Sequence, residues 1–124
     1  MATDLRIDAE NKPGALASIA KTLGDAGVNI EGYCGVGNGG QGVIHLLVDD
    51  AAGARRALEG GSHPVAAERE ALLVERSEDR PGYLAEIASK LGDAGINVDV
   101  GYVATDTRLV FVVDDPARAK DLLG

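Results

Sequence analysis

The sequence is poor in aromatic residues and in cations. It has no tryptophan, and aromatic residues make up only 3% of its 124 positions. There are 12 lysines and arginines against 20 aspartates and glutamates, which gives a net charge of −8. Because binding to phosphates or to an anionic membrane depends on clustered positive charge, this balance argues against nucleic acid and membrane partners.

Cysteine and long apolar segments are also scarce. The single cysteine, Cys34, excludes an internal disulfide and a cysteine-based metal cluster. No apolar run reaches the length needed to span a membrane, and the N-terminus lacks the pattern of a secretion signal. With 45% hydrophobic and 26% charged residues, the composition is typical of a globular protein, which we expect in the cytoplasm. The 17 glycines indicate many turns or close backbone approaches.

An internal repeat decides the organisation of the chain. Residues 11–30 align with residues 79–98 without a gap, and 12 of these 20 positions are identical. Residues 47–51 align with residues 112–116 in a register changed by three, so the second copy has a shorter loop before this segment. The chain is therefore predicted to be a duplication of one unit, with the first copy at 1–69 and the second at 70–124.

Both copies predict the same order of elements. Apolar residues at 5, 7 and 9 alternate with polar ones, as in a strand. Pro13 and Pro81 are each expected at the first position of a helix that is apolar at i, i+3, i+4 and i+7. Gly27 and Gly95 end these helices in a left-handed conformation. Two strands and an aspartate-capped helix follow: 29–36, 43–49 and 51–58 in the first copy, 97–104, 109–114 and 116–123 in the second.

The two copies differ in their last strand. The first copy continues into a predicted strand at 63–68, which runs almost directly into the strand at 71–76 that opens the second copy. No counterpart of the strand at 63–68 is predicted in the second copy. We therefore expect an α+β fold of two ferredoxin-like βαββαβ units in tandem, with antiparallel sheets and helices on one face. The second unit is expected to lack its last strand.

The pattern Asn/Asp-x-Pro-Gly followed by Ala-Gly-x-Asn occurs once in each copy, at 11–14 with 26–29 and at 79–82 with 94–97. In this respect the chain resembles a tandem pair of ACT domains, and in particular small stand-alone proteins of this family that have no catalytic domain. The resemblance implies modules that sense amino acids and regulate metabolic enzymes. It also implies ligand contacts from the loop before the first helix and the start of the second strand, often across an interface between two units. Carried over, these are Asn11, Pro13, Gly14, Ala15, Leu16, Asn29 and Ile30, and Asp79, Pro81, Gly82, Tyr83, Leu84, Asn97 and Val98.

The chemistry of these positions suits an amino acid. Free N–H groups at a helix N-terminus favour a carboxylate, and a glycine there lets the ligand reach the backbone. Asn29 and Asn97 offer both a donor and an acceptor, and Asp79 carries a charge that can hold an ammonium group. Tyr83 stands where the first copy has Ala15, and is expected to narrow the second site or to supply a hydroxyl.

The chain differs from serine-sensing members of the family at one position, and its Pro-Gly segments have an alternative interpretation. Serine-sensing units carry a histidine two residues before the Asn/Asp position, where this chain has Ala9 and Ser77, so serine specificity is not expected. The Pro-Gly segments also have a purely structural interpretation, in which proline starts the helix, glycine makes the turn and Asn or Asp caps it.

Other motifs favour structural roles over chemistry. Residues 35–40 match G-x-G-x-x-G, but no helix follows, so a glycine-rich hairpin turn is favoured over a dinucleotide site. Cys34 is expected on the same side of its strand as Ile30, with His45 facing the opposite side, which favours a buried structural cysteine over a nucleophile–base pair. The acidic pairs at 49–50 and 114–115 lie where a strand becomes a helix, and capping is favoured over metal binding.

The face of the second sheet turned away from its helices is expected to be apolar, with Val103, Val110 and Val112 upon it. The missing strand also leaves an open edge beside residues 72–75. Both features favour a homodimer or a larger homo-oligomer.

The resulting hypothesis is a non-catalytic regulatory protein that senses a small amino acid between units, with no catalytic residue, metal or cofactor. The alternative is a ligand-free interaction module or the regulatory subunit of an amino-acid biosynthetic enzyme.

Overall fold

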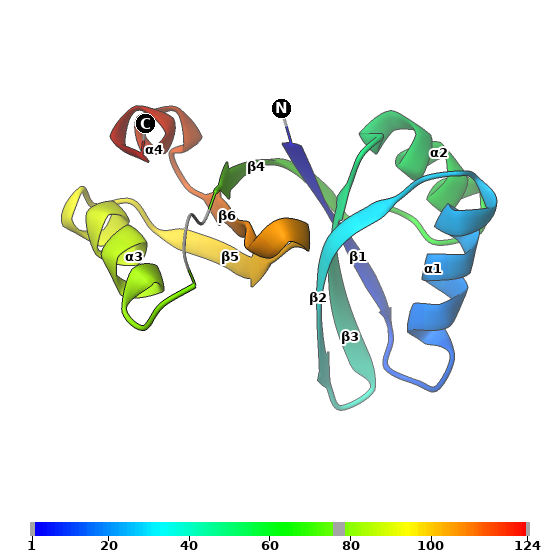
Figure 1. Ribbon diagram of the computed structural model, residues 1–124. Coiled ribbons are helices and arrows are strands. Elements are labelled where there is room, and N and C mark those ends of the chain that lie inside the picture. Colours follow the sequence, from blue (N-terminus) through cyan, green and yellow to red (C-terminus); the bar gives the residue numbers. More distant parts are fainter. Residues whose placement is uncertain (1, 76–78, 124) are drawn as a thin grey trace. The chain divides into compact units, whose positions relative to one another are not determined.

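The computed structural model describes residues 2–75 and 79–123, and the chain divides into two compact units, Ala2–Arg69 and Glu70–Gly124. Figure 1 follows the chain from β1 to α4. Each unit has the expected order of strands and helices, and the α+β class with antiparallel strands is confirmed. No described helix is long and apolar enough to cross a membrane.

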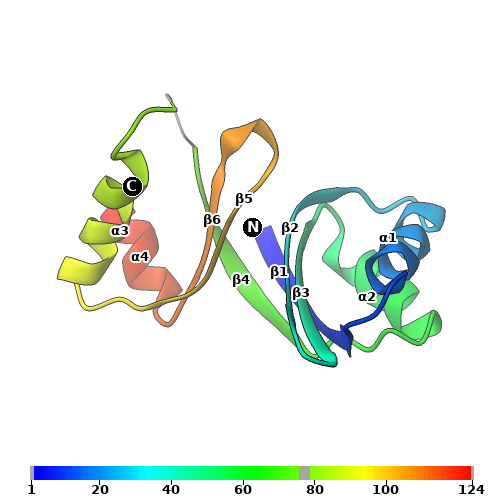
Figure 2. The same cartoon turned by 90° about the horizontal axis from the view of Figure 1, so that it is seen from below.

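The first unit contains β1 (Ala2–Glu10), α1 (Ala15–Asp25), β2 (Ile30–Asn38), β3 (Gln41–Val48) and α2 (Ala51–Gly60). β3 lies between β1 and β2 and pairs with both in antiparallel fashion. The Ala66 N–H donates to the Arg6 carbonyl at 2.8 Å, so the segment that follows α2 lies along β1. Both helices cover one face of these strands (Figure 2), and their apolar sides meet the strands in one core cluster.

The second unit is built on the same plan with fewer strands. β4 (Ala67–Val74) pairs through its second half with β6 (Leu109–Val113), which also pairs with β5 (Val98–Val103). The helices α3 (Tyr83–Asp93) and α4 (Pro116–Leu123) cover one face of these strands (Figure 2). A turn of 3-10 helix, Thr105–Thr107, joins β5 to β6. Among the described residues this unit has no fourth strand.

A single strand, β4, covers the end of the strand predicted at 63–68 and the start of the one predicted at 71–76, and residues 63–66 are not in a strand. The prediction of two strands was wrong because the sequence between 68 and 71 holds no glycine, proline or other turn residue, so the extended backbone continues without a break. Position 76 of that prediction lies outside the described residues, as does Ser77.

The first helix of each unit begins two residues later than predicted. α1 starts at Ala15 and α3 at Tyr83, so neither proline occupies the first helical position. The N-cap residues are Gly14 and Gly82, whose φ angles of 87° and 91° are left-handed and favour glycine. No side chain caps either helix, so the predicted Asn or Asp cap is absent at both. Gly27 and Gly95 do end the helices with φ of 75° and 74°, which confirms the prediction.

A β-bulge in β2 changes which residues share a face. Ile30 pairs with Val48 while Gly32 pairs with Leu47, so Glu31 is an extra residue in the strand. Beyond the bulge Cys34 is the direct partner of His45, and direct partners in an antiparallel pair point to the same face. The prediction that His45 faces away from Cys34 was therefore wrong. β5 has the same irregularity between Val98 and Val100.

Candidate functional site

The loop before α1 is held by backbone hydrogen bonds at both ends. The Ala15 N–H donates to the Lys12 carbonyl at 3.2 Å, and the Ser18 N–H donates to the Gly14 carbonyl at 2.9 Å. Between these two donors, the N–H groups of Leu16 and Ala17 have no hydrogen-bond partner anywhere in the part of the chain that the structure describes. Because these free donors lie at the positive end of the helix, the first turn of α1 can accept an anion.

Two depressions lie on either side of this loop, both within the first unit. One, of about 320 Å³, is lined by Asn11, Ala15, Leu16, Tyr33, Gly35 and Ile44, among others. The other, of about 450 Å³, reaches from Pro13 and Gly14 to Ser18 and His63. The Ser18 Oγ and His63 Nε2 atoms are 3.0 Å apart. Glu10 and Lys12 border both depressions and form an ion pair of 3.4 Å, so the site offers charges of both signs.

The glycine-rich hairpin fixes the loop from the other side. The Asn11 side-chain Nδ2 donates to the Gly39 carbonyl at 3.0 Å, and its backbone N–H donates to the Gly40 carbonyl at 3.0 Å. A Cβ on Gly37 would stand 2.4 Å from the Asn11 Nδ2 atom, so only glycine leaves room for this side chain. The hairpin that joins β2 to β3 is therefore a turn, as predicted, and it positions Asn11.

The corresponding loop of the second unit has the same backbone and different side chains. The Tyr83 N–H bonds to the Arg80 carbonyl and the Glu86 N–H to the Gly82 carbonyl, which again leaves two donors between them, on Leu84 and Ala85. The Tyr83 hydroxyl, however, donates to the Glu75 carbonyl at 3.0 Å. The Arg80 guanidinium lies 5.6 Å from the centre of the Tyr83 ring.

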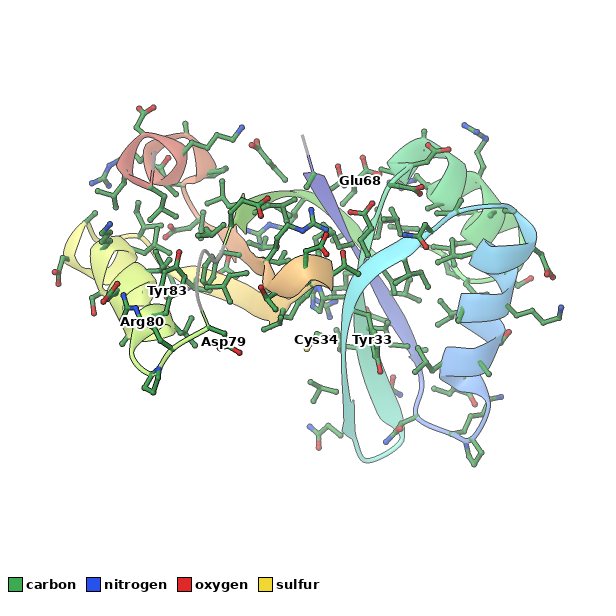
Figure 3. All side chains as sticks on the ribbon, in the orientation of Figure 1. Tyr33, Cys34, Glu68, Asp79, Arg80 and Tyr83 are labelled. Carbon is green, nitrogen blue, oxygen red and sulfur yellow. The ribbon has the colours of Figure 1, made fainter. Side chains whose placement is uncertain are left out.

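Arg80 also spans the first turn of α3, with its Nη2 atom 2.7 and 2.8 Å from the two carboxylate oxygens of Glu86. Figure 3 shows Asp79, Arg80 and Tyr83 gathered at this end of α3. Tyr83 is half-buried and packs against the core cluster of its unit. Where the first unit has a small alanine and an open depression, the second has a tethered aromatic ring and a bidentate ion pair.

The predicted asparagines do not lie near these loops in their own units. Asn29 precedes β2 at the end opposite to the hairpin, and its N–H donates to the Asp49 Oδ1 atom at 3.1 Å. Since β2 has nine residues, Asn29 is about 30 Å from Asn11. In the second unit the Asn97 N–H bonds to the Asp114 Oδ1 atom at 3.0 Å, beyond the far end of β5. Ile30 and Val98 are half-buried against the two cores.

The two aspartates of each acidic pair make different hydrogen bonds. Asp50 caps α2 by accepting from the Gly53 N–H at 2.9 Å, and Asp115 accepts from the Arg118 N–H at 3.2 Å, which confirms the capping prediction for these two. Asp49 and Asp114 instead hold the backbone of Asn29 and Asn97. Among the described residues, no three His, Cys, Asp or Glu side chains gather as a metal site.

The face of the first sheet that carries Cys34 holds two polar pairs, Arg6 with Asp8 and His45 with Asp4. The His45 Nδ1 and Asp4 Oδ2 atoms are 2.8 Å apart, and the Asp4 side chain is buried. Figure 3 shows Cys34 and Tyr33 leaving β2 on opposite sides. Among the described residues, no hydrogen bond joins Cys34 to His45.

In the second unit Val110 and Val112 are buried and Val103 is exposed. Val103 is the direct partner of Leu109, which belongs to the core cluster beneath the helices, so the prediction that Val103 faces away from the helices was wrong.

Several residues of the first loop were not singled out from the sequence. Glu10, Lys12, Ser18, Tyr33 and His63 border the two depressions. Glu10 and Lys12 flank the Asn-x-Pro-Gly motif, so their neighbourhood was visible in the sequence. His63 and Tyr33 come from distant segments, and only the pairing of the strands brings them to the loop.

Comparisons with known proteins agree with this architecture. The family model described as ACT domain matches residues 3–32 and 71–123. The crystal structure of protein BT0572 from Bacteroides thetaiotaomicron is similar with a TM-score of 0.81 and 22% identity, over 98% of this chain and 85% of that one. The regulatory subunits of aspartate kinase from Thermus thermophilus (ligand-free form) and Thermus flavus give TM-scores of 0.74 and 0.73. Their identities are 16% and 18%, over 98% of this chain and 87% of each of those. No curated protein matches the chain.

Proposed function

Because the chain belongs to the ACT domain family, we propose that it is a cytoplasmic, non-catalytic regulatory protein that binds a small amino acid. One observation carries the proposal. The two free N–H donors at the start of α1 lie beside an open depression whose border holds both Glu10 and Lys12. An amino acid presents a carboxylate and an ammonium one carbon apart, so it needs donors and a negative charge close together.

We assign the ligand to the first unit. With about 320 Å³, its depression is at the lower end of the size range of small-molecule pockets, which suits a small amino acid. At the second loop Tyr83 stands in place of Ala15, with its hydroxyl bonded to the Glu75 carbonyl, and Arg80 pairs with Glu86 across the first turn of α3. The second set of predicted residues is therefore proposed to bind more weakly or not at all.

The asparagines enter the proposal through a second copy of the chain. Asn29 lies about 30 Å from the loop of its own unit, so it contacts the ligand only if another chain brings it there. We therefore expect a homodimer or a larger homo-oligomer whose stability depends on the ligand. By linkage, the amino acid shifts this assembly equilibrium by the difference between its affinities for the two states.

Calorimetry with each proteinogenic amino acid tests the proposal. We expect one to bind, and the Gly14→Val and Ala15→Tyr variants to lose that binding. The matched variant Gly82→Val should keep that binding, because it makes the same substitution at a left-handed glycine of the second unit, outside the proposed site. Far-ultraviolet circular dichroism verifies that each variant is folded. If no amino acid binds at millimolar concentration, the chain is not a sensor. If Gly82→Val alone abolishes binding, the ligand site is in the second unit.

One observation favours the alternative of an interaction module or a regulatory subunit of a metabolic enzyme. The second unit has an apolar groove beside β4, and in the first unit the corresponding place is covered by residues 61–66 of that same unit. The two functions are compatible, because the loop at α1 and the groove belong to different units.

A further inference from the structure

The depression of about 320 Å³ beside α1 gathers apolar side chains at the surface of the first unit. Leu16, Tyr33 and Val36 line it, and they are 42%, 55% and 63% exposed. Among the described residues of the first unit, no other large hydrophobic residue is exposed. Single exposed apolar residues are normal on a protein surface, whereas a contiguous apolar patch indicates a binding site. Because all three residues line one depression, we expect it to hold an apolar group.

Strand pairing places this depression on the apolar side of the first sheet. Tyr33 is the direct partner of Leu46, and Gly35 is the direct partner of Ile44. Leu46 and Ile44 both belong to the core cluster beneath the helices. Direct partners in an antiparallel pair point to the same face, so positions 33 and 35 are on the side of β2 that faces the helices. Figure 3 shows Tyr33 leaving β2 on the side opposite to Cys34.

Gly35 leaves part of this depression free of any side chain. Its backbone is not left-handed, so its conformation does not require glycine. A Cβ on Gly35 would meet its nearest atom, the Ile44 Cγ1, at 3.9 Å, which is an ordinary contact, so packing does not require glycine either. A glycine inside a strand is often found where a ligand approaches the backbone closely. The room above Gly35 is therefore room for a ligand.

The second unit shows that the fold accepts a side chain at this position. Counted from the β-bulge that both units share, Gly35 corresponds to Val103. Val103 is the direct partner of Leu109, a core residue, just as Gly35 is the partner of the core residue Ile44. The first unit therefore has an empty space where the second carries a valine.

We propose that the depression beside α1 binds the aliphatic side chain of an amino acid of the size of valine or leucine. This inference rests on the proposed function, which supplies the amino acid. The ligand side chain takes the space above Gly35 that Val103 fills in the second unit, and it contacts Leu16 and Tyr33. A polar side chain would lose its hydrogen bonds to water against these apolar groups. The depression on the other side of the loop, with Ser18 and His63, suits polar side chains instead.

Calorimetric titration of the full chain with amino acids of matched shape tests the proposal. We expect L-valine or L-leucine to bind. Their polar counterparts, L-threonine and L-asparagine, should bind about tenfold to a hundredfold more weakly. Because the two members of each pair have nearly the same shape, the ratio of their affinities reports the polarity of the depression.

Two matched pairs of variants locate the bound side chain. Gly35→Val gives the first unit the residue that the second unit carries, and should weaken the binding of valine or leucine about tenfold or more. The control Gly101→Val changes a strand glycine of β5, at the position where the first unit has Tyr33, and should leave the affinity unchanged. Leu16→Asn should also weaken binding about tenfold, and its exposed counterpart Leu84→Asn should not. Far-ultraviolet circular dichroism verifies the fold of each variant.

The results distinguish a failure of this inference from a failure of the proposed function. If threonine or asparagine binds as tightly as its apolar counterpart, or if Gly35→Val leaves the affinity unchanged, the inference is wrong and amino-acid binding still holds. The same is true if another amino acid binds and neither valine nor leucine does. If no proteinogenic amino acid binds at millimolar concentration, both fail. Ligand-free self-association, measured by sedimentation, that Leu16→Asn abolishes would also overturn the inference, because a second copy would then occupy the depression.

Discussion

Leu58 and Leu123 are equivalent in the repeat but differ in burial, so alanine substitutions at the two positions should differ in their cost to the free energy of unfolding. Leu58 is fully buried, and the segment at 61–66 follows its helix. Leu58→Ala should therefore cost about 3–5 kcal/mol of unfolding free energy, through lost burial and the cavity left behind. Leu123, its half-buried counterpart, already meets solvent in the groove. Leu123→Ala leaves no enclosed cavity and should cost about 1 kcal/mol.

The control pair lies on the first helix of each unit. Leu23 and Leu91 are equivalent in the repeat and both are 0% exposed, so their alanine variants should cost the same, about 3–5 kcal/mol each. Urea unfolding followed by far-ultraviolet circular dichroism gives these free energies, provided that the slope with denaturant is unchanged between variants. If the units unfold in separate steps, Leu23→Ala and Leu58→Ala should shift the step of the first unit. Leu91→Ala and Leu123→Ala should shift the step of the second unit.

The reasoning is wrong if Leu123→Ala costs as much as Leu58→Ala while the control pair behaves as expected. That result would mean that something covers Leu123 in solution. A cost that rises with protein concentration would identify the cover as a second copy of the chain.

Three further changes test single contacts of the described structure. Gly37→Ala should displace the Asn11 side chain and cost about 1–2 kcal/mol of unfolding free energy, measured in urea. The control Gly35→Ala, whose Cβ would meet its nearest atom at 3.9 Å, should not show this loss. Equal costs of the two variants would contradict the role of Gly37. Asp50→Ala removes the cap of α2 and should cost about 1 kcal/mol, and recovery with Asp50→Ser would attribute the cost to capping. Tyr83→Phe removes the bond to the Glu75 carbonyl, just after β4, and should lower the unfolding free energy by about 1 kcal/mol, while an unchanged value would show that the hydroxyl is free in solution.

The sequence predicted best what depends on local periodicity. The stripe of apolar residues at three- and four-residue spacing identified both first helices, and Ile19 and Leu23 are buried as it requires. Leu16, in the same stripe, is 42% exposed, because the helix has only just begun there and Leu16 borders a depression. Gly27 and Gly95 were identifiable since a left-handed residue must end each helix.

Features that depend on pairing between distant strands could not be predicted. Nothing in the composition of β2 shows that Glu31 is a bulge, since a bulge is defined by the partner strand. The error on Cys34 and His45 follows directly from it. In the same way, asparagine is a common helix-capping residue, but the side chain of Asn11 donates to the Gly39 carbonyl of the glycine-rich hairpin and does not cap the helix.

The candidate site shows the same division between local and distant causes. The sequence identified both Pro-Gly loops, and the structure gives them the same backbone, with a left-handed glycine and two free donors each. What separates the loops is the residue after the glycine and the segments that pack on it. Tyr83 reaches the Glu75 carbonyl only because β4 ends beside α3, a relation that no local pattern reveals.

The duplication has left each unit with a different opening. The first unit covers the groove beside its opening strand with residues 61–66 and keeps the loop at α1 open, because Ala15 is small. In the second unit Tyr83 stands at the loop, and no segment of the described residues covers the groove beside Leu72 and Val74. The two loops of this chain of 124 residues therefore differ. We propose an amino-acid site only at the loop of α1, and changes at the loop of α3 should leave that site intact.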